Sequence, residues 1–322
     1  MSRPIAFVLA LAAVLAAGSA AQAQDYPDHP IKLVVPFAPG GGADIIGRLW
    51  TEAMRARVGP VFVENEAGAG GTVGAATVAR SPSDGYTLMV TSGGPIFLMG
   101  GVRAPFDAAK DFAAVTILGT TTLAVMVNPA VPAADLNELV AYAKANPGKL
   151  SYGSAGVGTM THLAGALLKS LTGADIVHVG YKGGGQFVSD LIGGSLPMGM
   201  MNLTTQVVEL HRVGKLRMLA TTGPNREGTT PDIATAAEQG FPDMVARNFY
   251  GVFAPASTRD AIVARISSAT RAALAEDGFR EKLRGAGYEP YPDPSPEAAR
   301  RFVQDEASKW RPMIKAAEPK PE

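Results

Sequence analysis

The sequence predicts an α/β protein of two lobes, each a mainly parallel sheet flanked by helices, with two crossover strands joining the lobes. Strand, glycine turn and helix recur along the chain, which is typical of parallel sheets covered by helices. Two long extended runs, residues 121–130 and 248–256, enclose one complete set of strands and helices. The 322 residues are enough for two medium-sized domains.

The N-terminus has the three-part layout of a secretory signal peptide. Arg3 precedes an apolar run from Ile5 to Ala17, and Ala21-Gln22-Ala23 forms an A-x-A cleavage site. The run is short for a membrane span, which needs about 20 residues. We therefore expect cleavage after Ala23 (residues 1–23) and a freely soluble protein in the periplasm. Lobe 1 would then comprise residues 24–124 and 250–322, and lobe 2 residues 125–249.

Composition excludes several functional classes. The 29 basic and 29 acidic residues balance, which argues against a nucleic-acid partner. The chain has no cysteine, which excludes disulfides, thiolate metal sites and cysteine nucleophiles. The four histidines lack metal-ligand spacing, and neither a G-x-S-x-G elbow nor a phosphate-binding loop is present. We expect no metal, no cofactor and no catalytic residue. We also expect a monomer, since the sequence has no long apolar patch that would need a partner to cover it.

Two helix starts can be predicted from local signals. Residues 131–135 are expected to open a helix that runs through Ala145 and stops at Asn146-Pro147-Gly148. Ser257 to Asp260 resembles a capping box before another helix.

The glycine-rich turns are the strongest functional signal. Gly40 to Gly42 separate an apolar strand from the helix that starts near Asp44, and three similar turns follow along the chain. Each precedes a helix N-terminus, which exposes unpaired N–H groups and partial positive charge. Two opposed lobes could therefore surround a carboxylate with donors and use no arginine. Each turn could equally be a plain strand-to-helix connection.

The polar side chains near these turns also have structural interpretations. Asp44, Ser154 and Thr159 could simply cap helices. His162 could be an interior residue that is satisfied by its neighbours. The three methionines at positions 198, 200 and 201 fit core packing better than ligand contact.

The ordered motifs resemble the solute receptors of tripartite tricarboxylate transporters, the Bug family. They include YPDHPIKLVVPFAPGGGAD, VENEAGAGGTVGA, SPSDGYTLMV, AYAKANPGKLSYGSAGVGTMTHLAG, HVGYKGGGQ, GKLRMLATTG and FYGVFAPAST, and they cover nearly the whole chain after residue 23. The resemblance implies a type II periplasmic binding protein, or Venus flytrap. It implies a small carboxylate ligand held partly by backbone amides and ordered water, and delivery to integral-membrane permease subunits.

The resemblance also implies a set of ligand contacts from both lobes. They are Phe37, Gly41, Gly42, Ala43, Asp44, Thr91 and Ser92 in lobe 1, and Ser154, Ala155, Gly158, Thr159, Tyr181 and Asn202 in lobe 2. The chain departs from the family pattern at Gly180, at Pro197 and in the TSGGP loop after Val90. Methionines surround Pro197, so we expect a more apolar far end and an aromatic or longer-chain carboxylate in preference to citrate.

Two other classes of function stay open at this point. A ligand-sensing module that acts through a two-component sensor kinase would have the same receptor features. An exported enzyme would turn over the acid that it binds.

Overall fold

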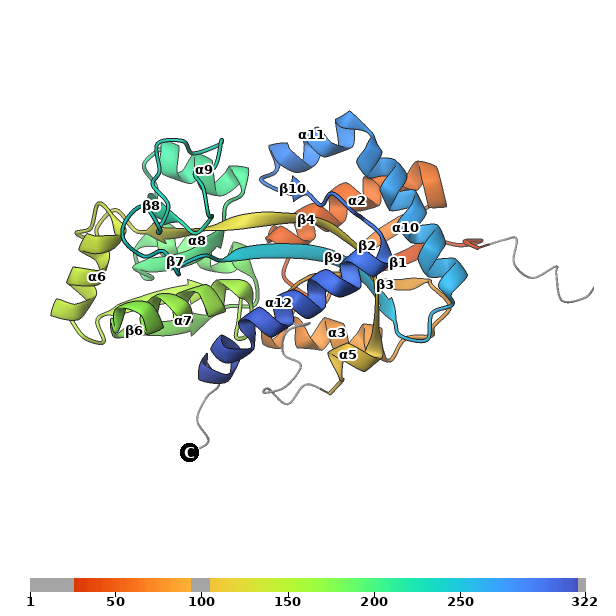
Figure 1. Cartoon of the computed structure of the whole chain (residues 1–322), viewed down its shortest axis with the longest axis horizontal. Coiled ribbons are helices and arrows are strands. Elements are labelled where there is room, and N and C mark those ends of the chain that lie inside the picture. The colour runs from red at the N-terminus through yellow and green to blue at the C-terminus, as the bar shows by residue number, and fades with distance from the viewer. Residues whose placement is uncertain (1–25, 94–104, 318–322) are drawn as a thin grey trace, which may run out of the picture.

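The computed structural model describes residues 26–93 and 105–317, which form two α/β lobes on one continuous sheet (Figure 1). The strand order is β2-β1-β3-β9-β4-β7-β5-β6, and β8 and β10 each pair with β4. The predicted signal peptide lies outside the described residues, as do Gly94 and Pro95 of the TSGGP loop. Among the described residues, no helix is both long and apolar enough to cross a membrane.

Lobe 1 is built on three parallel strands, with β1 between β2 and β3. Its elements are β1 (Ile31–Val35), α2 (Gly42–Val58), β2 (Val61–Asn65), the short 3-10 helix η1 (Ala69–Gly71), α3 (Thr72–Ala79), β3 (Thr87–Ser92), α5 (Ala108–Asp111), α10 (Asp260–Ala275), α11 (Asp277–Gly285) and β10 (Glu289–Pro290). Trp50 of α2 is fully buried, and its indole Nε1 donates to Thr270 Oγ1 of α10 at 3.0 Å. This hydrogen bond joins two helices that pack against each other.

Lobe 2 repeats the plan, with β5 between β6 and β7 and parallel to both. Its elements are α6 (Leu136–Ala145), β5 (Leu150–Ser154), α7 (Met160–Thr172), β6 (Ile176–Gly180), α8 (Gly184–Gly193), β7 (Met198–Asn202), α9 (Thr205–Arg212) and β8 (Arg217–Thr221). Met198 and Met200 are fully buried in this core, as predicted. Met201, which is also buried, reaches the cavity described below.

Two long strands, β4 (Phe112–Val127) and β9 (Arg247–Pro255), connect the lobes. β4 pairs with β9 from Phe112 to Thr122 and with β7 from Leu123 onward. Strand β4 therefore changes its pairing partner between Thr122 and Leu123. Figure 1 shows the two strands running side by side from one lobe to the other. The predicted crossover strands are confirmed, although β4 starts well before the predicted run at residue 121.

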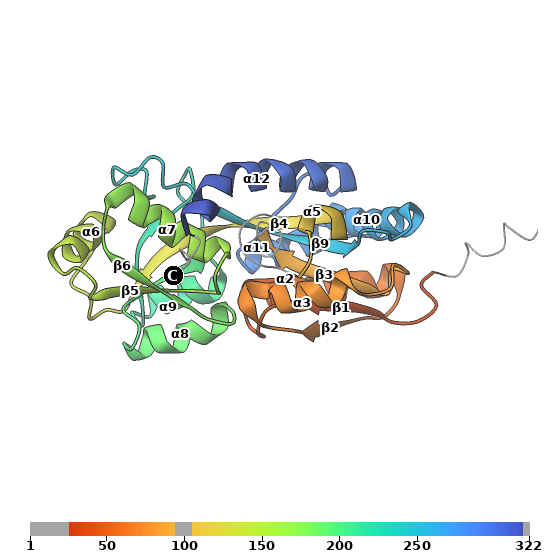
Figure 2. The same ribbon diagram turned by 90° about the horizontal axis from the view of Figure 1, so that it is seen from below.

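The C-terminal helix α12 (Pro296–Ala317) packs on both lobes (Figures 1 and 2). It begins beside lobe 1, and Trp310 near its end joins the buried cluster that contains Leu163 and Leu168 of α7. The sequence predicts that all of residues 250–322 belong to lobe 1. The residue-by-residue division of the chain stays a prediction, because one helix contacts both halves.

Two predicted helix starts differ from the structure. The helix expected from Val131 begins only at Leu136, because the carboxylate of Asp135 caps it by accepting from the amide of Glu138 at 2.8 Å. It ends at Ala145, as predicted. The capping box expected at Ser257 is wrong, since Arg259 occupies the N-cap of α10 and no side chain caps that helix.

Candidate functional site

A small cavity lies between the lobes, next to the carboxyl ends of β1, β5, β6 and β7. Parallel sheets usually bind their ligands at this end. The cavity volume is about 40 Å³, room for about three water molecules. In the described part of the chain, no charged side chain lines it. The lining residues are Gly40, Gly41, Gly42, Ile45, Ala155, Thr161, Gly184, Gly185, Phe187, Val188, Met201, Asn202, Thr204, Gln206 and Val207.

Three helices begin at this cavity without a side-chain cap. Their N-cap residues are Gly41 for α2, Gly183 for α8 and Thr204 for α9. The first N–H groups of an α-helix have no partner inside the helix and carry partial positive charge. One helix comes from lobe 1 and two from lobe 2, so the two lobes together place donors around one small space. The fourth helix that starts here, α7, is capped by Thr159.

The carboxylate of Asp44 holds the glycine turn of lobe 1 in place. Its Oδ2 accepts from the amide of Gly40 at 3.0 Å, and its Oδ1 accepts from Asn65 Nδ2 at 3.0 Å. Arg48 donates to both oxygens, and Asn65 Nδ2 also donates to the carbonyl of Phe37. Burial opposes ionisation of Asp44, but the hydrogen bonds from Arg48, Gly40 and Asn65 outweigh it and hold the pKa below its usual value. Asp44 thus positions the turn from inside lobe 1.

Gly41 and Gly42 are needed for different reasons. A Cβ on Gly42 would overlap the hydroxyl of Tyr250 and lie 3.2 Å from Asn202 Nδ2. A Cβ on Gly41 would make only ordinary contacts, at 3.6 Å from the amide nitrogen of Gly184 in lobe 2. Packing at the start of α2 therefore requires glycine at position 42. At position 41, the space for a side chain depends on how closely the lobes approach each other.

A hydrogen-bond network shapes the loop of lobe 2 that faces this turn. Ser154 Oγ lies 2.7 Å from His178 Nε2, and the amide of Gly158 donates to His162 Nδ1 at 3.1 Å. Thr159 Oγ1 donates to the carbonyl of Gly156 at 2.6 Å. These bonds fix residues 154–162 between β5 and the first turn of α7. The side chains of Ser154 and Thr159 are thus used within lobe 2.

Both histidines of this network stay neutral near neutral pH. Burial lowers the pKa of His162 to about 4, and its Nδ1 accepts a hydrogen bond, which requires an unprotonated nitrogen. Burial, with smaller contributions from the charges of His162 and Lys169, lowers the pKa of His178 to about 3. The two rings lie 4.1 Å apart between centroids. The expected interior role of His162 agrees with this geometry.

The lobes are in contact around the cavity. The amide of Ala38 in lobe 1 donates to the carbonyl oxygen of Lys182 in lobe 2 at 3.2 Å. A Cβ on Gly70 of lobe 1 would overlap the carbonyl of Val157 in lobe 2. The structure is therefore a closed one, in which glycine backbones of the two lobes touch.

The structure brings part of the predicted contact set to the cavity. Gly41, Gly42, Ala155 and Asn202 line it. The others surround it without lining it. Phe37, Ala43, Thr91, Ser92, Ser154 and Thr159 are buried within their own lobes; Asp44, Gly158 and Tyr181 have the partners Gly40, His162 and Asp190.

Sequence reasoning missed several lining residues. Gly184 and Gly185 belong to the YKGGG turn, where the glycine pattern that singled out Gly41 also occurs. Ile45, Phe187, Val188 and Val207 have no local signal, because an apolar residue in the first turns of a helix looks the same whether it faces a core or a cavity.

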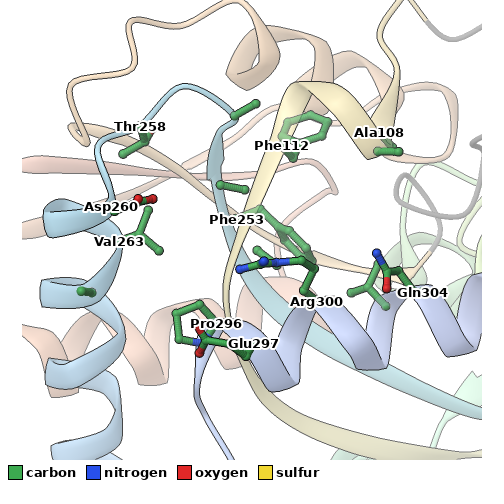
Figure 3. Close-up of a pocket in the computed structure, with 16 residues that line it drawn as sticks. Ala108, Phe112, Phe253, Thr258, Asp260, Val263, Pro296, Glu297, Arg300 and Gln304 are labelled. Carbon is green, nitrogen blue, oxygen red and sulfur yellow. The ribbon is translucent and has the colours of Figure 1, made fainter.

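A larger hollow of about 640 Å³ lies between α5, α10 and α12 (Figure 3). Phe112, Phe253 and Val263 contribute to its apolar wall, and Arg300 and Gln304 reach it from α12. All of its lining comes from lobe 1 and α12, so movement of lobe 2 does not enclose it. The smaller cavity is the candidate site, because both lobes form it.

Known proteins resemble this chain along nearly its whole length. The family model described as tripartite tricarboxylate transporter family receptor matches residues 46–318. Protein BugT from Bordetella pertussis is 32% identical over 319 residues, which cover 98% of this chain and 97% of BugT. MatC from Rhodopseudomonas palustris with bound malate is 30% identical, with a TM-score of 0.85, and the match covers 90% of this chain and 100% of MatC. A further R. palustris structure, with adipate, is 31% identical, with a TM-score of 0.86 and coverage of 91% and 98%.

Two α/β lobes that close over a small cavity between them define a solute-binding protein of the periplasmic type. The chain belongs to the tripartite tricarboxylate transporter receptor family, which confirms the resemblance found in the sequence. Its relatives are solute-binding proteins, and the chain is not an enzyme.

Proposed function

We propose that this chain captures a small organic carboxylate between its lobes and delivers it to the membrane permease of a tripartite tricarboxylate transporter. One observation carries the proposal. Three uncapped helix N-termini, from both lobes, meet at a cavity whose described lining has no charged side chain. Each N-terminus carries about half a positive charge, so an anion is the ligand that this arrangement stabilises most.

The relatives support the chemical class of the ligand. MatC holds malate and the other R. palustris structure contains adipate, and both ligands are small carboxylates. The carboxylate would lie against the backbone of Gly41 and Gly42 on one side and of Gly184 on the other. The predicted contacts that do not line the closed cavity would act by shaping its walls.

The remaining lining supports a ligand with an apolar body. Ile45, Phe187, Val188, Met201 and Val207 form an apolar wall, and Thr161, Asn202, Thr204 and Gln206 provide polar groups. Buried apolar walls stabilise ligands by removing apolar surface from water. An aromatic or longer-chain carboxylate therefore fits the lining better than citrate does.

The closed cavity must widen to accept such an acid. Its volume of about 40 Å³, room for about three water molecules, is too small for an acid as long as adipate. The Ala38–Lys182 contact joins the two loops that frame the cavity, so its release would admit the ligand. We propose that the lobes turn about β4 and β9, opening to admit the acid and closing again until the two glycine-rich loops meet around it.

The proposed location is the periplasm, after cleavage of residues 1–23. The signal-peptide layout of the N-terminus and the periplasmic solved relatives support it. The proposed partners are the ligand and the permease subunits, as the family description implies.

Thermal unfolding tests the capture step. The chain from Gln24 onward is screened against mono-, di- and aromatic carboxylates, each paired with its carboxamide. At a ligand concentration of 100 times Kd, a ligand that binds only the folded state adds about 2.7 kcal/mol of stability. We expect at least one acid to raise the unfolding temperature while its amide does not. The absence of any shift, with no acid found by native mass spectrometry, would overturn the proposal.

A further inference from the structure

Two asparagines meet where the ligand cavity adjoins the crossover strands. Asn202 ends β7 and lines the cavity, and Asn248 lies near the start of β9. The amide nitrogen of Asn248 donates to Asn202 Oδ1 at 3.0 Å and to the hydroxyl oxygen of Tyr250 at 3.2 Å. Asn248 is buried, with 4% of its surface exposed. One buried amide thus contacts a cavity residue of lobe 2 and a tyrosine of lobe 1.

The hydrogen bonds determine which way both amides point. Asn248 Oδ1 accepts from the amide of Phe249 at 3.0 Å, so the nitrogen of Asn248 must be the atom that faces Asn202. Asn202 consequently presents its oxygen to Asn248. Its own nitrogen lies 3.2 Å from the place that a Cβ on Gly42 would take, at the start of α2. That nitrogen donates no hydrogen bond to another described residue.

Tyr250 is oriented by the same amide. Its oxygen accepts from Asn248, which leaves the hydroxyl proton free to donate elsewhere, and the hydroxyl lies beside Gly42. Burial raises the pKa of Tyr250 far above its usual value, so the hydroxyl keeps its proton. Tyr288, whose ring packs edge-on against Tyr250, donates to the carbonyl of Gly42 at 2.9 Å. Donors therefore surround the N-terminus of α2.

We infer that Asn248 is a positioning residue that fixes the ligand selectivity of the cavity for hydrogen-bond acceptors. It holds Asn202 with its NH₂ group toward the α2 N-terminus, so a carboxylate is accepted there and a carboxamide is disfavoured. The inference rests on the proposed function and deepens it. If Asn202 were released, its amide could turn over and offer an oxygen, which repels a carboxylate and accepts from an amide. Sites built around fixed donors reject ligands that leave those donors unpaired.

The test measures the ratio of affinities for an acid and its carboxamide. Calorimetric titration uses the tightest acid of the screen above and its amide, with adipate and adipamide as the first pair. In Asn248→Leu, which has similar size and no hydrogen bond to Asn202, we expect the acid-to-amide ratio to fall about tenfold or more, as loss of one hydrogen bond to a charged group implies. In Asn248→Asp the ratio should fall further, because Asn202 then turns its nitrogen toward residue 248.

A second variant distinguishes loss of the donor from loss of folding. Asn202→Asp keeps the hydrogen bond from Asn248 and replaces the donor toward the cavity with a charged oxygen. It should fold normally, by thermal unfolding, and lose acid binding while its amide binding is spared. If these variants weaken the acid and the amide by the same factor, Asn248 and Asn202 are merely structural and the inference is overturned. If the wild-type protein binds no acid at all, the proposed function itself fails.

Discussion

The amide of Ala38 donates a hydrogen bond to the carbonyl oxygen of Lys182 at 3.2 Å, and this bond joins the two lobes beside the ligand cavity. Both residues belong to glycine-rich loops, one before α2 and one before α8. Side chains on these loops would keep the backbones apart. The close approach of bare backbone is therefore part of how the protein encloses its ligand.

Gly185→Ala should weaken ligand binding without weakening the fold. A Cβ on Gly185 would lie 3.2 Å from the carbonyl oxygen of Pro39 in lobe 1, which is closer than usual and resists closure. Within helix α8, alanine is favoured over glycine by up to about 1 kcal/mol. We expect a lower affinity by calorimetry and an unchanged or higher unfolding temperature. Gly193→Ala, in the same helix with no atom within 4 Å of its Cβ, is the matched control. Equal affinities in the two variants would contradict this account.

Gly41→Val should reduce affinity more than stability. The Cβ of an alanine fits at this position, 3.6 Å from the amide nitrogen of Gly184, but the branched methyls of valine would reach into lobe 2. Gly41 has φ −83°, which any residue adopts, so the backbone is not strained. We expect about a tenfold or greater loss of affinity for Gly41→Val and a small loss for Gly41→Ala. Normal binding by the valine variant would show that Gly41 only forms a turn and has no role in ligand binding.

Gly42→Ala should instead destabilise lobe 1. Its Cβ would overlap the buried hydroxyl of Tyr250, and overpacking of this kind costs about 1–3 kcal/mol. Removing that hydroxyl with Tyr250→Phe should restore part of the loss. A double-mutant cycle of urea unfolding measures the coupling between the two positions. If the two substitutions changed the free energy of unfolding additively, overlap with the Tyr250 hydroxyl would not be the reason that position 42 needs glycine.

Stability should decrease as pH falls from about 6.5 toward 4. His162 and His178 have pKa values of about 4 and 3 in the folded protein, whereas unfolded histidines take up protons near pH 6.5. The unfolded state then binds more protons, so acid favours unfolding. For His162 the loss between pH 7 and pH 5 is roughly 1–2 kcal/mol, and His178 adds less because its ring is more exposed. Urea unfolding of His162→Gln/His178→Gln should show a flatter pH profile; an unchanged slope would contradict this assignment.

The sequence predicts the fold well because its signals are local and repeated. The glycine turns between strands and helices identify the parallel sheets, and the long runs at residues 121–130 and 248–256 identify the crossover strands. The start of α6 is missed because Asp135 is a stronger cap than the proline-rich stretch before it. No local signal predicts the path of α12 over both lobes, since that path depends on how α12 packs against α7.

The candidate site is predicted best where backbone decides it. Gly41 and Gly42 follow from a strand-to-helix turn, whereas Ala155 and Asn202 follow from the family resemblance, and all four line the cavity. Polar side chains are harder to predict, because the hydroxyl of Ser154 pairs with the half-buried His178 and the carboxylate of Asp44 binds its own turn. The role proposed for Asn248 needs the structure, since 46 residues separate it from Asn202 in the sequence.

A crystal structure of the protein with its bound acid tests the central claim most directly. The account predicts a carboxylate between the lobes, with its oxygens about 3 Å from backbone amides at the starts of α2 and of α8 or α9, directly or through one water. A ligand seated in the hollow beside Arg300, or a carboxylate paired with an arginine or lysine side chain in the cleft, would contradict it.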